Sequence, residues 1–137
     1  MSDSPEKLLA EPSVCVLATV GRDGQAHAMP MWHLYEDGKL IFMTGRRAQK
    51  CRNIERTGTA TVVCDRRSPP YYAVMVQGKA SIGPALDADA RRRMVERYLS
   101  PEAAERYLEQ LAATVADAVS IVVEPTRIVE FNGSAGR

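Results

Sequence analysis

Two Asp-Gly pairs constrain the fold of this chain more than any other local feature. Asp23-Gly24 follows an apolar, β-branched run, and Asp37-Gly38 precedes another. Asp-Gly between strand-like segments is a strong signal for a tight β-hairpin, because these residues adopt the left-handed backbone of the turn at low cost. The two turns predict an antiparallel meander of three strands, at residues 14–20, 25–35 and 39–44.

The rest of the chain adds further strands with helices inserted between them. Pro30 interrupts the ladder of the middle meander strand, which predicts an edge position or a bulge. The remaining expected elements are a short helix opened by Ser4, a helix at 48–56, strands at 59–65 and 71–82, helices at 87–99 and from Ser100, and closing strands at 118–123 and 127–131 joined by a turn at 124–126.

This order of elements has no regular βαβ alternation, which argues against a parallel, doubly wound sheet. Six or seven strands linked mostly by hairpins close most economically into a small antiparallel barrel. We therefore expect a mainly β fold with inserted helices, in a single domain of residues 1–137, and a mobile tail from Asn132 onward.

Residues 44–56 are the most informative stretch for function. They hold five of the eighteen Lys and Arg residues and follow an apolar run. A strand that ends in a glycine and leads into a basic helix start suits an anionic ligand, because the first N–H groups of a helix lack partners and carry partial positive charge. Arg46, Arg47 and Lys50 add full charges. The alternative is a solvated basic face between two strands.

The overall charge narrows the class of ligand. The formal net charge of 137 residues is +1, whereas a general nucleic-acid binder carries a strong basic excess. The local cluster therefore suits one small phosphorylated molecule. No apolar run approaches the roughly 18 residues that span a bilayer, and residues 1–7 lack a secretory signal pattern.

Three cysteines, Cys15, Cys51 and Cys64, stand far apart without a Cys-x-x-Cys pair. An odd number without metal spacing predicts reduced thiols in a cytoplasmic protein, with Cys15 and Cys64 as small core residues. His27 and His33 have no acidic or cysteine partner at metal-ligand spacing, so no metal site is expected.

Several motifs follow one another in a fixed order between residues 14 and 82. They are the strand and turn at 14–24, Met29-Pro30-Met31-Trp32, Tyr35-Glu36-Asp37-Gly38, the segment 42–54, and Ser68-Pro69-Pro70-Tyr71 before Val76-Gln77-Gly78-Lys79-Ala80. In this order and spacing they resemble the FMN-binding split-barrel family related to pyridoxamine 5′-phosphate oxidase. The lysine followed by Arg-Asn in a short chain most resembles the actinobacterial flavin/deazaflavin reductase group, in which many members use coenzyme F420.

The resemblance implies an antiparallel split barrel and a homodimer with two cofactor sites, each built from both subunits. It places Lys50 on the cofactor phosphate, with Arg46 and Arg47 nearby. The chain departs from the group at Ala48, where many relatives carry a second basic or hydroxyl residue, and Arg47 is the candidate substitute. The matching strand end and helix also contribute Thr44 and Asn53.

The segment around Pro30 is the candidate slot for the cofactor ring. A proline leaves its ladder position without a donor and widens a groove for a flat ring, and methionines supply a soft apolar wall. Trp32 is either a ring contact or a core or interface anchor. Tyr71 either faces the cofactor of the other subunit or lies half-exposed at an interface. The slot would consist of Met29, Pro30, Met31, Trp32 and Met43.

No nucleophile, base and orienting acid stand at a recognisable spacing, so the catalytic residues stay unassigned. Their absence fits hydride transfer, in which the cofactor carries the chemistry. We expect an F420-dependent oxidoreductase that transfers a hydride from reduced deazaflavin to an unsaturated small-molecule substrate, without a nucleic-acid or membrane partner. The alternatives are an FMN-dependent, pyridoxamine 5′-phosphate oxidase-like oxidoreductase and a non-catalytic binder of flavin or haem.

Overall fold

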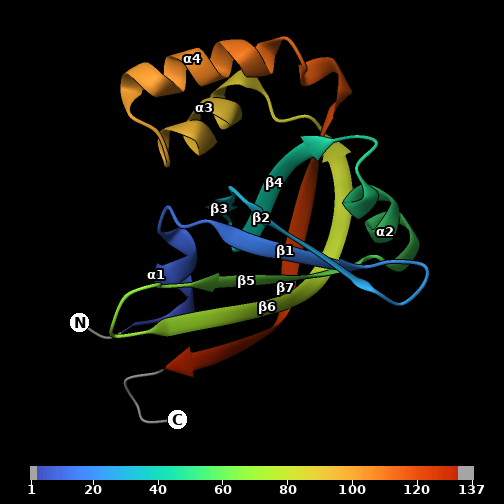
Figure 1. Ribbon diagram of the computed structural model, residues 1–137, viewed down its shortest axis with the longest axis vertical. Helices are drawn as coiled ribbons and strands as arrows, with labels where there is room; N and C mark the ends of the chain where they lie inside the picture. Colours follow the sequence, from blue (N-terminus) through green and yellow to red (C-terminus); the bar gives the residue numbers. More distant parts are fainter. Residues whose placement is uncertain (1–2, 133–137) are drawn as a thin grey trace.

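The computed structural model describes residues 3–132 and contains one sheet of seven strands in the order β2-β1-β5-β6-β7-β4-β3 (Figure 1). All neighbouring strands are antiparallel, which confirms the predicted mainly β barrel of six to seven strands. The strands are β1 (Cys15–Val20), β2 (Ala26–Met31), β3 (Leu34–Glu36), β4 (Lys39–Gly45), β5 (Thr59–Asp65), β6 (Tyr72–Pro84) and β7 (Ala118–Asn132).

The two Asp-Gly hairpins form as predicted, but they lie at opposite edges of the sheet. Gly24 has φ 85°, and Asp37 and Gly38 have φ 53° and 74°, so both turns use the left-handed backbone. The first hairpin pairs β1 with β2 and the second pairs β3 with β4. The predicted three-stranded meander is therefore wrong, because residues 25–35 form two strands instead of one.

Trp32 and His33 separate these two strands because other elements hold their side chains. The Trp32 ring stacks on Tyr98 with 4.8 Å between centroids, and His33 Nε2 lies 2.8 Å from the carbonyl oxygen of Leu9. Pro30 pairs opposite Val16 on the edge strand β2, as its missing donor predicts. Since β2 and β3 are consecutive in the chain but terminal in the sheet, the curled sheet stays open between them. We call this opening the seam.

The C-terminal segment forms one long strand, β7, where two strands and a turn were predicted. Pro125 does not break it, because a bulge at Thr126 of β7, opposite the step from Gln77 to Gly78 of β6, absorbs the irregularity. At the bulge the backbones approach so closely that a Cβ on Gly78 would lie 2.4 Å from the oxygen of Glu124. The strand therefore bends, and its first half pairs with β4 as well as β6.

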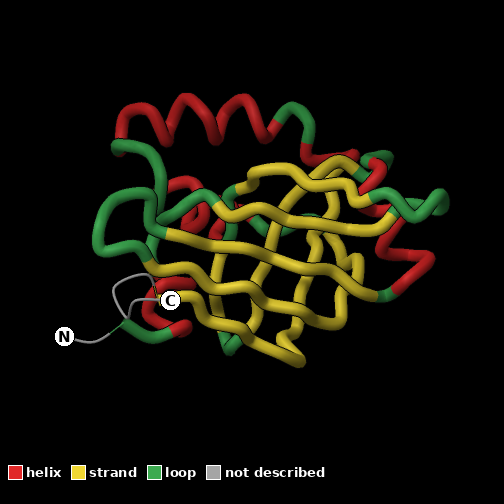
Figure 2. Tube along the Cα trace, turned by 60° about the horizontal axis from the view of Figure 1, so that its bottom comes forward, coloured by secondary structure: helices red, strands yellow, loops and turns green. Residues whose placement is uncertain are grey.

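Alternate residues of the strands fill the barrel core. Leu17, Phe42, Val62 and Ile121 point inward and are at most 1% exposed. In Figure 2 the curved sheet carries helices at its ends, and no helix crosses the outer face of the long strands. Apolar side chains thus cover one face of each strand, as the period of two predicts.

Of the four described α-helices, two lie at opposite ends of the barrel and the other two lie side by side outside the sheet (Figure 1). Ser4, Asp87 and Ser100 cap three of them through side-chain oxygens, as predicted from the sequence. The third helix is shorter than the predicted segment 87–99. The bounds are α1 (Pro5–Ala10), α2 (Gln49–Thr57), α3 (Ala88–Glu96) and α4 (Pro101–Ala112), with a 3₁₀ turn at Val115–Asp117.

Two further expectations concern the termini and membranes. Asn132 is the last residue of β7, and the rest of the tail predicted to be mobile lies outside the described residues. Among residues 3–132, no helix has the length and apolar character needed to cross a membrane.

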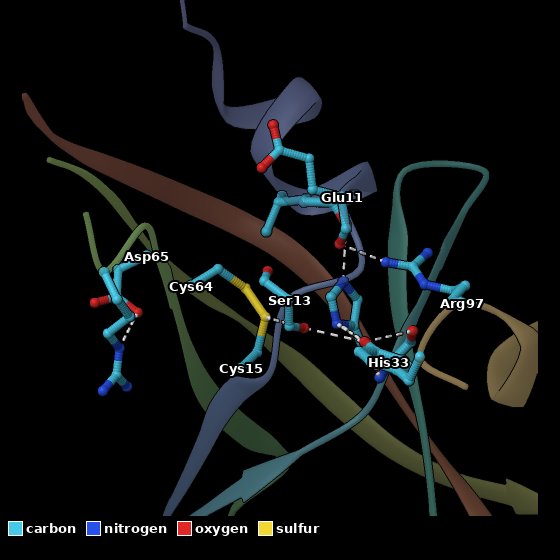
Figure 3. Close-up of a disulfide and its surroundings, with 10 residues drawn as sticks. Glu11, Ser13, Cys15, His33, Cys64, Asp65 and Arg97 are labelled. Atoms are coloured by element: carbon cyan, nitrogen blue, oxygen red, sulfur yellow. Dashed lines mark hydrogen bonds and ion pairs between the residues drawn. A yellow bond between two sulfur atoms is a disulfide. The ribbon is translucent and has the colours of Figure 1, made fainter. Parts of the chain in front are cut away.

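The cysteines differ from expectation. Cys15 and Cys64 are fully buried in the core, as predicted, but they are joined by a disulfide instead of being reduced thiols (Figure 3). They occupy facing positions on β1 and β5, with their Cα atoms 4.7 Å apart. Cys51 is free and buried. The sequence count could not reveal this pair, because the sheet brings together residues 49 positions apart.

We expect this disulfide to stabilise the native state by about 2–4 kcal/mol, because it restricts the unfolded chain. Adding a reductant should lower the free energy of unfolding of the wild type by this amount, measured by urea denaturation. The control is the double variant Cys15→Ser/Cys64→Ser, whose stability should not respond to reductant. Three reactive thiols in the unreduced, urea-unfolded wild type would contradict the pairing.

Candidate functional site

An apolar cavity of about 450 Å³ lies between the barrel and the helical pair α3 and α4. Its barrel wall comes from both sides of the seam, because β2 supplies Pro30 and Met31 and β4 supplies Met43. Val14 and Trp32 complete that wall. The helical wall consists of Arg91, Met94, Val95, Tyr107 and Leu111.

An aromatic cluster fastens the helical pair over this cavity. Trp32 stacks in parallel on Tyr98 and meets Tyr107 of α4 at 5.2 Å between centroids. The Tyr98 hydroxyl accepts the backbone N–H of His33 at 3.1 Å and donates to the carbonyl oxygen of Ser13 at 3.0 Å. Trp32 therefore anchors α3 and α4, and its remaining edge lines the cavity.

A polar cavity of about 420 Å³ lies at the other end of β2, where the β1–β2 turn meets α2. His27 lines it, and the Nδ1 atom of that ring is buried without a hydrogen-bond partner among the described residues. From α2, Gln49 and Asn53 face the same space. Its other lining residues are Gly21, Arg22, Asp23, Gln25 and Ala26.

Hydrogen bonds fix the wall that α2 gives to the polar cavity. Asn53 is fully buried and donates to Thr19 Oγ1 at 3.0 Å, while Gln49 donates to Asn53 Oδ1 at 2.9 Å. Arg52 donates to Gln49 Oε1 and to the carbonyl oxygen of Arg47, both at 2.8 Å. The first turn of α2 is thus held rigidly against β1.

The start of α2 carries no side-chain cap. Ala48 occupies the N-cap position and makes no capping hydrogen bond, so the first N–H groups of the helix lack a side-chain acceptor. Arg46 and Arg47 precede this turn and are exposed, and Lys50 is half-buried within it. An uncapped helix start among three cations is well suited to an anion.

The two cavities lie along one edge strand. Side chains of β2 alternate, so His27, Met29 and Met31 share one face, with His27 at the polar cavity and Met31 at the apolar one. Four residues of strand span about 13 Å between them. Met29, between the two, is 47% exposed. The seam thus has a polar cavity near the uncapped, cationic start of α2 at one end and an apolar cavity at the other.

Five of the eleven predicted site residues line the two cavities, and Met29 lies between them on β2. The other five line neither cavity; they are Thr44, Arg46, Arg47, Lys50 and Tyr71. Pro30, Met31, Trp32 and Met43 line the apolar cavity, and Asn53 lines the polar one. Thr44 is the penultimate residue of β4 and is half-buried. Tyr71 is 51% exposed before β6 and lies on neither cavity of its own subunit.

The lining residues that sequence reasoning missed include Arg22, Gln49 and Arg91. Arg22 belongs to a hairpin turn, and Gln49 looked like a neutral neighbour of Lys50. Arg91 is one of three consecutive arginines on α3, and the sequence alone did not distinguish it from the other two. Arg91 lies three residues before Met94, so the amphipathic pattern of α3 places it on the apolar side of the helix. This pattern was the sequence signal that could have identified Arg91.

His33 lies beside the disulfide in the fully buried part of the barrel (Figure 3). Burial lowers the pKa of His33 from 6.5 to about 4, the Leu9 carbonyl opposes this shift, and the charge of Arg97 adds to it. A ring nitrogen of His33 and the sulfurs of Cys15 and Cys64 lie within 4.8 Å of one another, which the sequence spacing did not indicate. Metals bind thiolates, so these sulfurs, joined in a disulfide, do not form a metal site.

Residues 1–133 match the family model described as pyridoxamine 5′-phosphate oxidase. The chain belongs to this family. The resemblance seen in the motifs is thereby confirmed. None of the curated proteins compared with the chain matches it.

Solved structures of this family share the fold. An F420 reductase superposes with a TM-score of 0.76 at 28% identity, covering 94% of this chain and 98% of that one. A conserved hypothetical protein from Mycobacterium tuberculosis gives 0.73 at 21% identity, over 97% and 87% of the two chains. General stress protein 26 from Bacillus anthracis gives 0.67 at 22% identity, over 91% and 88%. The last two show likeness of fold alone.

The depressed pKa of His33 makes stability depend on pH. The unfolded state binds a proton near pH 6.5 and the folded state only near pH 4, so this contribution is complete above pH 6.5 and is lost as the pH falls toward 4. Between pH 7 and 4.5 the free energy of unfolding should fall by about 2–3 kcal/mol through His33. Urea denaturation at both values measures it.

Two variants separate this effect from other titrations. His33→Gln should remove about that much of the pH dependence, since glutamine can still donate to the Leu9 carbonyl without titrating. His27→Gln, on β2, is the matched control and should keep the wild-type dependence. Equal pH dependence in His33→Gln and the wild type would show that His33 is not responsible.

Proposed function

We propose that the protein is an oxidoreductase that binds a flavin-type cofactor in the seam, with coenzyme F420 as the first choice. The observation that carries this proposal is the path along β2. It joins an uncapped, cationic helix start to an apolar cavity, as a cofactor with a phosphate at one end and a flat ring at the other requires.

The residues present fit such a group. His27 Nδ1 is a buried polar atom without a partner beside the polar cavity, so a ligand there would satisfy it. Lys50 has a flexible, compact charge close to the uncapped turn and would hold the phosphate. Arg46 and Arg47 would add long-range attraction, and Arg47 is placed one position before the uncapped Ala48.

The apolar part of the path would hold the ring. Met29 is exposed on β2 between the two cavities, and Met31 and Met43 line the apolar cavity from opposite sides of the seam. Thioether side chains pack well against aromatic rings. The bound cofactor would supply hydride transfer to an unsaturated substrate, while α3 and α4 exclude water from one side of the site.

The choice between cofactors rests on similarity. The F420 reductase, at 28% identity and with nearly complete coverage of both chains, favours F420. An FMN-dependent oxidoreductase is the second candidate, because Lys50 and the uncapped helix start suit any phosphate. F420 carries a polyglutamate tail, so its binding should weaken more with added salt than that of FMN. The alternative outside the enzymes is a protein that binds flavin or haem without catalysing a reaction.

We further propose that the protein is a homodimer that pairs through the outer face of the sheet. One cross-strand row on this face is apolar across five strands, and its members are Pro30, Val16, Val63, Met75 and Val129. Val63 is 36% exposed, although its neighbour Val62 is fully buried on the inner face. A continuous apolar row on an uncovered sheet face favours association with a second copy.

Lys50→Ala should weaken the binding of F420 and of FMN by about tenfold to a hundredfold, because a charge-assisted phosphate contact is lost. Equilibrium titration followed by cofactor absorbance or fluorescence measures this. Lys7→Ala, which removes an exposed lysine from α1, is the control and should bind like the wild type. Unchanged dissociation constants for both cofactors in Lys50→Ala would place the anionic site elsewhere.

Val63→Lys should convert the dimer into a folded monomer, because it puts a charge in the middle of the outer apolar row. Ile128→Lys is the matched control, since Ile128 is 38% exposed and lies opposite Val76 on the other face of the sheet. Sedimentation at micromolar concentration distinguishes the states. A wild type that is already monomeric, or a Val63→Lys variant that stays dimeric, contradicts this interface.

A further inference from the structure

We propose that the apolar cavity beneath α3 and α4 binds a small apolar molecule that carries one carboxylate, with Arg91 as the residue that holds this carboxylate. This inference deepens the proposed function and rests on it, because it makes the cavity the substrate end of the seam and the substrate an apolar organic acid.

The three consecutive arginines on α3 have different environments. Arg92 is ion-paired with Glu105 and Glu96, and Arg93 makes two hydrogen bonds to Glu36, at 2.9 and 3.2 Å. Both are solvated surface contacts. Arg91 has no carboxylate within ion-pair distance in the part of the chain that the structure describes. Its charge is therefore left for a ligand.

Arg91 is also the arginine that faces the cavity. It is half-buried, and it is the one charged residue that lines this space within residues 3–132. Its Nη1 atom donates to the carbonyl oxygen of Leu86 at 2.7 Å, which fixes the side chain near the start of the helix. A guanidinium has five N–H donors, so this bond leaves others available for an oxygen acceptor.

The apolar surroundings of Arg91 strengthen its attraction for an anion. Met94 and Val95 follow Arg91 on the same helix and are 6% and 1% exposed, and Met31 and Met43 form the opposite wall. A cation beside apolar walls is less screened than one in water, so it attracts an anion more strongly. Burial of the apolar part of a ligand against the same walls is also favourable. The charge of Arg91 and the apolar walls together favour a molecule that has both a carboxylate and an apolar part.

The cavity contains its own reporter. Trp32 is the single tryptophan of the chain and lines this space, so its fluorescence reports occupancy of the cavity and not of the outer sheet face. We would titrate the wild type at neutral pH with octanoate and with octanamide, which differ in the charge of one end group. The titration contains no F420 or FMN, so its result is independent of cofactor binding and of the Lys50→Ala test.

Octanoate should bind about tenfold to a hundredfold more tightly than octanamide, as a charge-assisted contact provides. Arg91→Gln should abolish this preference by weakening octanoate binding alone. Arg91→Lys should retain part of it, because lysine keeps the charge. The matched control is Arg92→Gln, on the same helix but away from the cavity, which should keep the full preference.

Three results would overturn the inference. They are equal affinity of the wild type for the two ligands, an undiminished preference in Arg91→Gln, and no change in Trp32 fluorescence with either ligand. Far-ultraviolet circular dichroism of each variant confirms that it is folded, and the behaviour of Arg91→Lys separates loss of charge from loss of the Leu86 hydrogen bond.

Discussion

The pairing of β6 with β7 holds the two halves of the sheet together. β6 connects through β5 to β1 and β2, while β7 connects through β4 to β3, so this one pair joins the two halves of the sheet. The bulge at Thr126 bends it, and the space beside Gly78 is filled by the backbone of Glu124. Because the bend turns the two halves toward each other, the terminal strands β2 and β3 face one another across the seam without pairing.

The candidate site follows from this opening. A closed barrel would use the inner face of β2 for packing, whereas the seam leaves Met29 exposed and gives cavities at both ends of the strand. The chain crosses between the two edges at Trp32 and His33. Both residues contact Tyr98, and this contact holds α3 and α4 in place. One connection between two strands thereby positions the helical wall of the apolar cavity.

Local signals predicted the parts of the fold that depend on local chemistry. The two Asp-Gly turns and the helix starts at Ser4 and Ser100 each act within a few residues, and all formed as predicted. Pro125 was misleading because a bulge at the next residue, Thr126, lets β7 continue past it, and that bulge depends on the pairing with Gln77 and Gly78 of β6. The Cys15–Cys64 bond depends on strand register, which spacing in the sequence does not reveal.

The candidate site, like the fold, could be predicted from the sequence only where it depends on local motifs. The order of the motifs predicted that Pro30, Met31, Trp32 and Met43 belong to one slot, and in the structure all four line one cavity. Motif order could not identify Arg91, because its role depends on which of three adjacent arginines lacks a carboxylate partner. That distinction arises from the packing of α3 against α4 and β3, which provide Glu105 and Glu36.

We have proposed that a flavin-type cofactor lies along β2 in the seam. A crystal structure of the protein with F420 tests it most directly. We expect the phosphate at the first turn of α2 beside Lys50, and the ring against Met29 and Met31 on the way to the apolar cavity. A ring bound on the outer face of the sheet, or a phosphate held away from α2, would contradict this account.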